Sequence, residues 1–486
     1  MSVVIALDQG TTSTRAIAFD GNGIPVATSQ VKLTQIYPHP GWCEHDPVEI
    51  LASAVHVLGE IVSAVGKQSI ACIGITNQRE TVVAWDKQTG EPLHNAIVWL
   101  DTRTSDLVKL NPDFDRFRKG TGLPVSTYFS SLKIKWLIDN VPAVKKCLDA
   151  GNCKFGTVDA WLAFKLTGNH YTDVSNASRY NLMNLRSLQW DLEICNAHSI
   201  PISSLPTIIP SSGFQLAISS NFQVLAGLKI TAMIGDQQAA LLGQGCLKPG
   251  NTKITFGTGC FILTNAGTQV PDNVPPSLLV TVGFKIGDRL FYAIEAAVSA
   301  GGRSLQALEE LGISDSIETT ERLAKSCSSD GVILIPAFAG LLSPHFKPEA
   351  RACIFGMTLS TSRAQICRAS FEAVTQSVRS AVDAISDLLE ISSIKVDGGL
   401  SQSKFLMQMQ ADAIGLEILT FTFSEVTAWG AALAAGAAVG IYPDPINEEI
   451  SRLRNTQGEI YKTQITEAER VSLARKFDAA VLKSLD

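Results

Sequence analysis

The sequence predicts an α/β protein made of two related domains with a cleft between them. Three observations support this expectation. The 486 residues exceed the size at which a single hydrophobic core usually stops growing. Short apolar strands alternate with helical patterns along the chain. One hairpin plan also appears twice, about half a chain apart, as expected for two copies of one domain design.

Each predicted hairpin consists of an apolar strand, a turn rich in glycine or threonine, and a returning strand. The three parts are residues 3–7, 8–14 and 15–20 in the first hairpin, and residues 252–256, 257–259 and 260–264 in the second. The chain between the hairpins ends in Leu247-Lys-Pro-Gly250, which reads as a connection. We therefore predict an N-terminal domain of residues 1–246 and a C-terminal domain of residues 247–486.

The remaining elements follow the α/β alternation. In the first half we expect strands at residues 70–75, 81–85, 96–99 and 230–234, with helices at residues 46–65 and 131–140. In the second half we expect helices at residues 364–389, 401–414 and 427–438 around a strand at residues 394–396. Low-complexity segments and long linkers are absent from the sequence.

Composition excludes several classes of function. Forty basic and 46 acidic residues give a net charge of −6, and no basic stripe would attract a nucleic acid or an anionic membrane. The ten cysteines show no metal-binding spacing and read as buried free thiols of a reducing compartment. Residues 1–8 do not resemble a signal peptide, and the apolar stretch 428–440 is too short to span a bilayer. We expect a cytoplasmic protein without membrane insertion.

Three glycine-rich turns are candidate phosphate sites, because oriented backbone amides bind anions and threonine hydroxyls add donors. The first begins at Asp8, the second is Gly257-Thr-Gly259, and the third, Val396-Asp-Gly-Gly-Leu-Ser-Gln402, joins a strand to a helix. The first turn alone would read as an ordinary hairpin. Its repetition, followed by the third turn, favours nucleotide binding.

Two hairpin loops followed by Asp-Gly-Gly before a helix resemble the actin, hexokinase and Hsp70 ATPase fold. Residues 128–140 and 352–372 are similar to the two long signatures of the FGGY carbohydrate kinases. Residues 40–47, 75–81, 95–99 and 235–240 resemble the glycerol kinases within that family. The resemblance runs from residue 5 to about residue 440. It implies two actin-like (ribonuclease H-like) domains and a catalytic cleft in which ATP phosphorylates glycerol.

The resemblance also implies a polyol site. It gives Asp236 the role of general base, and it gives hydrogen bonds to the substrate to Arg79, Glu80, Tyr128, Asp236 and Gln237, with Trp99 and Phe261 against the carbon chain. The residues by themselves leave other interpretations open. Asp236 could simply cap a helix, Arg79 and Glu80 could form a solvated ion pair, and the two aromatics could be ordinary core.

For the nucleotide, the resemblance implies that Asp8 holds Mg²⁺ through water and that both halves of the chain bind ATP. The nucleotide-binding positions are Thr11, Thr12, Ser13, Arg15, Gly257, Thr258, Gly301, Gln306, Gly399 and Ser403. Mg²⁺ suits one or two carboxylates together with phosphate and retained water. Relatives of this kind also suggest a homodimer or a homotetramer.

The sequence departs from the usual glycerol kinase pattern mainly in its second half. Ala296 replaces a common glycine, Ala307 a tryptophan and Ser403 an asparagine, and Lys347 reverses a charge. Residues 221–230 also lack the glycine- and arginine-rich loop with which bacterial relatives bind fructose 1,6-bisphosphate. Two alternatives stay open: a sister kinase of another polyol or ketose, and a catalytically silent relative kept for binding.

Overall fold

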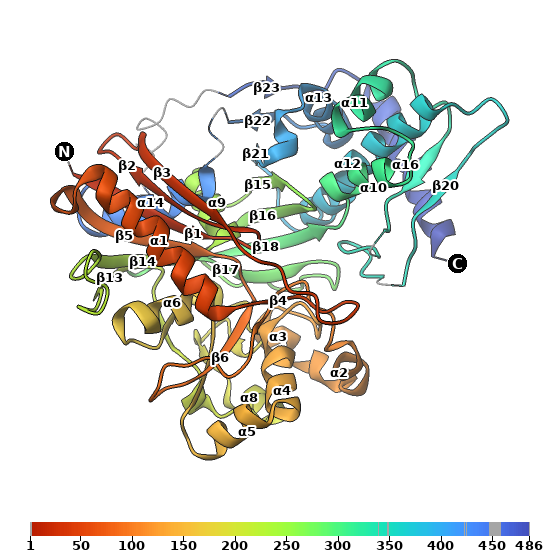
Figure 1. Cartoon of the computed structure of the whole chain (residues 1–486). Helices are drawn as coiled ribbons and strands as arrows, with labels where there is room; N and C mark the ends of the chain where they lie inside the picture. Colours follow the sequence, from red (N-terminus) through yellow and green to blue (C-terminus); the bar gives the residue numbers. More distant parts are fainter. Residues whose placement is uncertain are drawn as a thin grey trace.

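The computed structural model describes residues 2–485 apart from residues 339, 348, 422, 424 and 447–457. Its central feature is a sheet of thirteen strands to which both halves of the chain contribute (Figure 1). In spatial order these strands are β23 (Ile460–Tyr461), β22 (Ile418–Thr420), β21 (Ser393–Asp397), β15 (Asn251–Phe256), β16 (Cys260–Gly267), β18 (Arg289–Val298), β17 (Leu279–Ile286), β13 (Ser212–Ala217), β14 (Lys229–Gly235), β5 (Ile70–Asn77), β1 (Val3–Gln9), β2 (Ser13–Phe19) and β3 (Pro25–Lys32).

The strand order repeats within this sheet. In the first half, β3, β2 and β1 are antiparallel neighbours, and β5 and β14 continue in parallel from β1. In the second half, β18, β16 and β15 are antiparallel neighbours, and β21 and β22 continue in parallel from β15. The repeat confirms the prediction that one structural plan occurs twice, and each copy opens with one of the predicted hairpins.

The two copies meet through a pair of crossing helices. Helix α9 (Asp236–Gly243) follows β14 but packs against β15, β16 and β17, while α14 (Val426–Ala438) packs against β1, β5 and β14. Glycines permit the close crossing: a Cβ at Gly430 would lie 1.9 Å from Ala239 O, and one at Gly243 would lie 2.2 Å from Val426 O. Within the large sheet, the two halves join where β13 of the first half pairs with β17 of the second, through one register pair, Ser212 with Ile286.

Three hydrophobic cores hold this arrangement. One lies between the first-half strands and α1 (Pro47–Val65), one lies in the second half, and the third surrounds α9 and α14 where the copies meet. Cys260 and Cys367 belong to the second core, and Cys72 and Cys246 belong to the third. All ten cysteines are free, and eight are buried as predicted, but Cys327 and Cys353 are only partly buried, so the prediction is wrong for these two. The cores therefore fix the relative placement of the loops at the strand ends.

Helix α1 is long and apolar enough to cross a membrane by length and composition alone. In the structure one face of α1, including Ile50, Val57 and Ile61, is buried against the first-half sheet. Asp46 caps its first turn by accepting a hydrogen bond from Val48 N at 2.8 Å. α1 is therefore a helix that packs one face against the sheet.

Further elements complete the fold. A small sheet contains β4 (Glu44–His45), β7 (Ala96–Ile97), β6 (Val82–Asp86) and β8 (Cys153–Thr157). Further helical elements are α4 (Ser130–Asn140), α7 (Val174–Ala177), α10 (Gly302–Glu310), α12 (Arg363–Ser386), the 3₁₀ turn η4 (Gly399–Gln402), α13 (Lys404–Ile414) and α16 (Glu467–Ser484). Outlying elements include α2 (Ser105–Leu110), α3 (Arg118–Thr121), α5 (Pro142–Asp149), α6 (Val158–Thr167), α8 (Leu192–Ala197), α11 (Ile317–Lys325), β19 (Ile333–Ile335) and β20 (Cys353–Phe355).

Candidate active site

The first candidate phosphate loop is the tight turn between β1 and β2. Gly10 N donates to Ser13 O at 3.0 Å, which leaves Thr11 and Thr12 at the tip of the turn. The Thr11 hydroxyl accepts a hydrogen bond of 2.9 Å from the indole Nε1 of Trp99. A residue predicted to bind phosphate thus touches a residue predicted to contact the polyol.

Arg15 ties this loop to the second half of the chain. It lies opposite Asp8 on the paired strand, and its guanidinium donates to Gln30 Oε1 at 2.9 Å. The same guanidinium forms an ion pair with Glu425, the residue before α14. Arg15 therefore places a cation beside the loop and links the two copies of the fold.

The second candidate phosphate loop is closed by its own backbone. Gly257 N donates to Gly259 O at 3.0 Å, and Gly302 N, at the start of α10, donates to Gly257 O at 2.8 Å. A Cβ at Gly301 would lie 2.7 Å from Thr258 O, so only glycine permits this approach. The structure thus brings together the predicted positions Gly257, Thr258 and Gly301.

The third loop rests on the second. Gly398 has a φ of 91°, and a Cβ there would lie 2.4 Å from Phe256 O. A Cβ at Gly399 would meet nothing within 4 Å, so the backbone of Gly399 borders open space. Ser403 caps α13 through its hydroxyl, and Gln306 lies exposed on α10. These positions belong to elements that all adjoin the second hairpin.

A buried charged cluster lies where the two copies meet. Arg79, which follows β5, donates both terminal nitrogens to Glu295 of β18, at 2.7 and 3.2 Å. One of those nitrogens lies 3.3 Å from Tyr128 OH, and Arg79 Nε lies 3.3 Å from Asp236 Oδ1. Arg79 is 3% exposed, so the alternative of a solvated surface ion pair is wrong.

Arg179 completes the cluster. It donates to Glu80 Oε1 at 2.6 Å and to Glu295 Oε1 at 3.0 Å, and all three side chains are buried. Burial alone would raise the pKa of Glu295, but the charges of Arg179 and Arg79 outweigh burial and lower it to about 2. The two guanidinium groups of Arg79 and Arg179 therefore pair with the two carboxylates of Glu80 and Glu295. These contacts fix the position of the Arg79 side chain.

Glu80 has strained backbone at this point. Its φ is 60°, in the left-handed region that glutamate rarely adopts. Such strain costs about 1–3 kcal/mol and is found mainly at functional sites. Ser130, at the start of α4, donates its hydroxyl to Glu80 O at 3.2 Å and helps to hold this conformation.

Asp236 is the most accessible member of the cluster. Its side chain is 29% exposed, against 2% for that of Arg79. Gly235 occupies the N-cap of α9, so Asp236 is the first helical residue rather than the cap, and its Oδ1 accepts from Gln237 N at 2.6 Å. Burial, and next the charge of Asp236, raise the pKa of Asp8 to about 7. Asp8 and Asp236 are therefore close enough to interact.

Aromatic side chains form one wall beside these charges. The ring centroid of Trp99 lies 5.7 Å from that of Tyr128 and 6.1 Å from that of Phe261, both edge to face. None of the three rings is fully buried, so they are not simply core residues. Lys133 of α4 holds the backbone of Tyr128 by donating to its carbonyl at 2.6 Å.

Sequence reasoning missed three residues of this site: Arg179, Glu295 and Lys253. Glu295 lies within the apolar part of β18, and Lys253 is the one charged residue of β15; this pattern could have indicated that both are buried and paired. Arg179 lies in a polar segment after α7 and gives no such signal in a single sequence.

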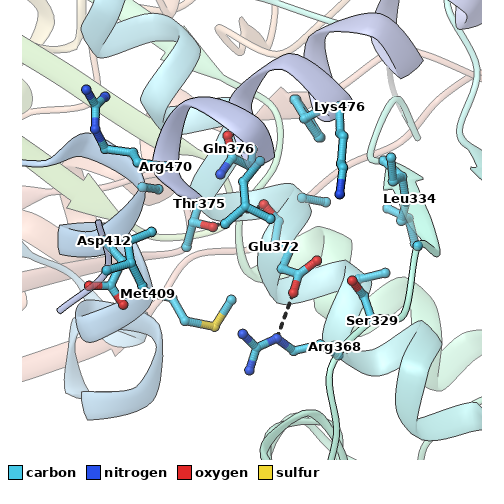
Figure 2. A pocket seen from close by; sticks show the side chains of 18 residues that line it. Ser329, Leu334, Arg368, Glu372, Thr375, Gln376, Met409, Asp412, Arg470 and Lys476 are labelled. Carbon is cyan, nitrogen blue, oxygen red and sulfur yellow. Dashed lines mark hydrogen bonds and ion pairs between the residues drawn. The ribbon is translucent and has the colours of Figure 1, made fainter. Parts of the chain in front are cut away.

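A separate cavity lies in the second half of the chain. Residues of α12, α13 and α16 line it, and Figure 2 shows Glu372, Asp412 and Arg470 among them. Its volume is about 390 Å³. Arg368 and Glu372 form an ion pair of 2.8 Å at its wall. None of the residues predicted from the sequence to act in catalysis or binding lines this cavity.

Two protein-family models match this chain. The N-terminal domain model of the FGGY family of carbohydrate kinases matches residues 3–243, and the C-terminal domain model matches residues 252–439. This chain belongs to the FGGY family of carbohydrate kinases. The family resemblance predicted from the sequence is thereby confirmed.

The chain is also similar to individual proteins over most of its length. The chain is 42% identical to the glycerol kinase of Pseudarthrobacter chlorophenolicus, over 99% of this chain and 98% of that protein. It is 44% identical to the glycerol kinase of Acidiphilium cryptum, over 90% of each chain.

Solved structures confirm the predicted fold. The crystal structure of Plasmodium falciparum glycerol kinase with ADP is 35% identical and superposes with a TM-score of 0.93, over 100% of this chain and 99% of that one. A xylulose kinase from Lactobacillus acidophilus, 21% identical with a TM-score of 0.88 over 99% of this chain and 97% of that one, shares the fold. The two-domain, actin-like α/β architecture is therefore the fold of this FGGY kinase.

Proposed function

We propose that this chain is a glycerol kinase, which transfers the γ-phosphoryl group of ATP to glycerol and forms ADP and sn-glycerol 3-phosphate. The observation that carries the proposal is the buried cluster of Arg79, Glu80 and Tyr128 that ends at the accessible carboxylate of Asp236. The identity of 42–44% to proteins named glycerol kinase supports it.

A three-carbon triol needs both donors and acceptors. Arg79 and Tyr128 supply donors, and Glu80 supplies a carboxylate whose second oxygen faces none of the described hydrogen-bond donors. Trp99 and Phe261 give the carbon chain an apolar wall. Buried polar groups of this kind penalise a substrate that lacks the matching hydroxyl, because they would be left unpaired.

Asp236 would act as the general base. The attacking hydroxyl oxygen forms a bond to the γ-phosphorus, the bond from that phosphorus to the β–γ bridging oxygen breaks, and the hydroxyl proton moves to Asp236. Arg79 Nε, 3.3 Å from Asp236 Oδ1, holds the carboxylate in place. Partial exposure of Asp236 gives the substrate access to it.

The three loops would bind ATP. The first loop (Thr11, Thr12 and Ser13) and Arg15 would meet the phosphates from one side, and Gly257 and Thr258 from the other. Gly301, Gln306, Gly399 and Ser403 would border the nucleoside, with the open backbone of Gly399 against the base.

Asp8 is the carboxylate that would hold Mg²⁺ through water. Burial, and after it the charge of Asp236, raise the pKa of Asp8 to about 7, and a cation beside Asp8 would favour its ionised form. Among the described residues no cluster of three or more metal-ligating side chains exists, which suits an ion held mainly by phosphate and water. Bound Mg²⁺ would neutralise charge on the phosphates.

Other parts of the proposal rest on the sequence. These are the domain division after residue 246, a cytoplasmic location without membrane insertion or nucleic-acid binding, and an assembly of two or four copies. The buried face of α1 is compatible with the absence of membrane insertion.

Purified protein with ATP, Mg²⁺ and a panel of polyols and ketoses tests the function. We expect glycerol to be the preferred substrate, with kcat/KM for 1,2-propanediol lower by at least about 10², because one buried partner of the missing hydroxyl is left unpaired. ADP release measured by a coupled assay gives these values. Preference for a ketose such as xylulose would favour the sister-kinase alternative, and no turnover of any substrate would favour the silent relative.

Fructose 1,6-bisphosphate should leave the initial rate unchanged up to millimolar concentration. Between Ser219 and Asp236 the one cation is Lys229, and its ammonium already donates to Gln215 Oε1 at 2.8 Å. A single ammonium replaces a guanidinium fork in a glycine-rich nest poorly. Initial rates across a titration of the bisphosphate check this expectation, and saturable inhibition at constant KM for ATP would contradict it.

A further inference from the structure

Lys253 is a buried lysine that the proposed reaction leaves without a role. It lies on β15, just before the second phosphate loop, and its side chain is 0% exposed. Its ammonium donates to Gln237 Oε1 and, at 2.9 Å, to Thr255 Oγ1. Lysine is almost never fully buried unless it is paired, so this position requires an explanation.

The strand geometry explains why Lys253 points toward the site. Residues 253 and 255 are two positions apart on β15, so both side chains project from the same face of the sheet. Thr255 is paired in register with Asp397 of the neighbouring strand β21, which begins the third glycine-rich loop. Lys253 therefore lies between the nucleotide loops of the second half and Gln237 of the first half.

Charged residues of three elements, and Arg79 after β5, influence the ammonium. Burial lowers the pKa of Lys253 to about 8, while Asp397 of β21, Asp236 of α9 and Glu295 of β18 favour its charged form and Arg79 opposes it. At neutral pH the group is mostly protonated. It can then only donate hydrogen bonds.

This property fixes the orientation of the Gln237 amide. An ammonium has no acceptor, so the atom of Gln237 that it contacts must be the oxygen, whichever way an amide is drawn. With Oε1 engaged by Lys253, the amide turns its N–H₂ group away from Lys253. Gln237 therefore presents a hydrogen-bond donor, its N–H₂ group, on the side away from Lys253.

We propose that Lys253 is a positioning residue for the polyol: from the second half of the chain it locks the Gln237 amide so that its N–H₂ group donates to a substrate hydroxyl. This inference rests on the proposed function, because it assumes that Gln237 contacts the polyol. It also assigns a direction to that hydrogen bond, with the hydroxyl oxygen as acceptor. The hydrogen bond from Lys253 to Gln237 joins β15 of the second half to α9 of the first half.

Lys253→Met tests the proposal, because methionine fills a similar volume without a donor. We expect KM for glycerol to rise about 10- to 100-fold, the effect of losing a hydrogen bond to a charged group, while KM for ATP changes less than about threefold. Lys253→Arg, which keeps the charge and the donors, should restore part of the loss. A purely structural role would not separate the two KM values.

Lys395→Met is the matched control. Lys395 is the register partner of Lys253 on β21, and its ammonium donates to the Gln244 and Gly245 carbonyls at 2.7 and 3.2 Å. The Lys395→Met substitution removes a similar lysine from the adjacent strand and should leave KM for glycerol unchanged. An unchanged KM for glycerol in folded Lys253→Met, or an equal rise in Lys395→Met, would overturn the proposal.

Gln237→Glu covers the case in which the lysine variants do not fold. Glutamate keeps an oxygen for Lys253 but replaces the N–H₂ donor with a second oxygen, so KM for glycerol should again rise at least about tenfold. An unchanged KM in this variant would also overturn the inference. The proposed function is tested separately by the wild type: if it does not phosphorylate glycerol, that function fails whatever the variants show.

Discussion

Asp236→Asn should lower kcat by about 10² to 10⁴, the usual contribution of a general base. Asparagine preserves the shape of the side chain and can still accept the hydrogen bond from Gln237 N, which is 2.6 Å long in the wild type. It cannot accept the proton of the attacking hydroxyl. ATP affinity should stay within about twofold, because the predicted nucleotide loops are untouched. Steady-state kinetics and calorimetric ATP titration measure the two effects.

Asp46→Asn provides the control for this variant. Asp46 is also a carboxylate at the start of a helix, and its Oδ1 accepts from Val48 N at 2.8 Å at the head of α1. Its substitution should leave kcat within about twofold, because Asn caps helices nearly as well as Asp. If Asp236→Asn keeps more than about a tenth of wild-type kcat, Asp236 serves only the helix and the proposed mechanism is wrong.

Much of the fold could be predicted from local sequence, because its main signals are local. The two hairpins combine apolar runs with turns rich in glycine or threonine, and the structure places them as β1–β2 and β15–β16. Helix positions followed from apolar spacing to within a few residues, as for α12. Gly398 is required where the third loop contacts Phe256 of the second hairpin, so the glycines at 398 and 399 indicated that loop in the sequence.

The charged cluster was only partly predictable, because it depends on pairing across the two halves. Arg79 and Glu80 were found through the resemblance, but their partners Arg179 and Glu295 lie 99 and 216 residues further along the chain from them. A single sequence carries no signal that joins such distant positions. The crossing of α9 and α14 was likewise hidden, since α14 packs on strands of the first half and α9 packs on strands of both halves.

The buried cluster makes a second strong prediction: Glu295→Gln should destabilise the protein by about 3–5 kcal/mol. The variant leaves the guanidinium groups of Arg79 and Arg179 buried without their shared carboxylate, which is the costly way to break a buried ion pair. A drop of several degrees in Tm should follow. Glu310→Gln is the control: it breaks an exposed pair with Arg303, worth about 0–1 kcal/mol, and should barely change Tm.

The pH dependence of this loss identifies its cause. The pKa of Glu295 is lowered to about 2 from an ordinary value of 4.5, so its ionised form stabilises the folded state above pH 4.5. That stabilisation disappears as pH falls from about 4.5 toward 2, since the carboxyl then takes up a proton in the unfolded chain first. The difference in Tm between wild type and Glu295→Gln should therefore be full at about pH 6–7 and shrink below about pH 4.5. Calorimetric scans across this range measure it. A difference that stays constant with pH would mean that the introduced glutamine side chain disturbs packing rather than charge, and that Arg79 is not held by an ion pair.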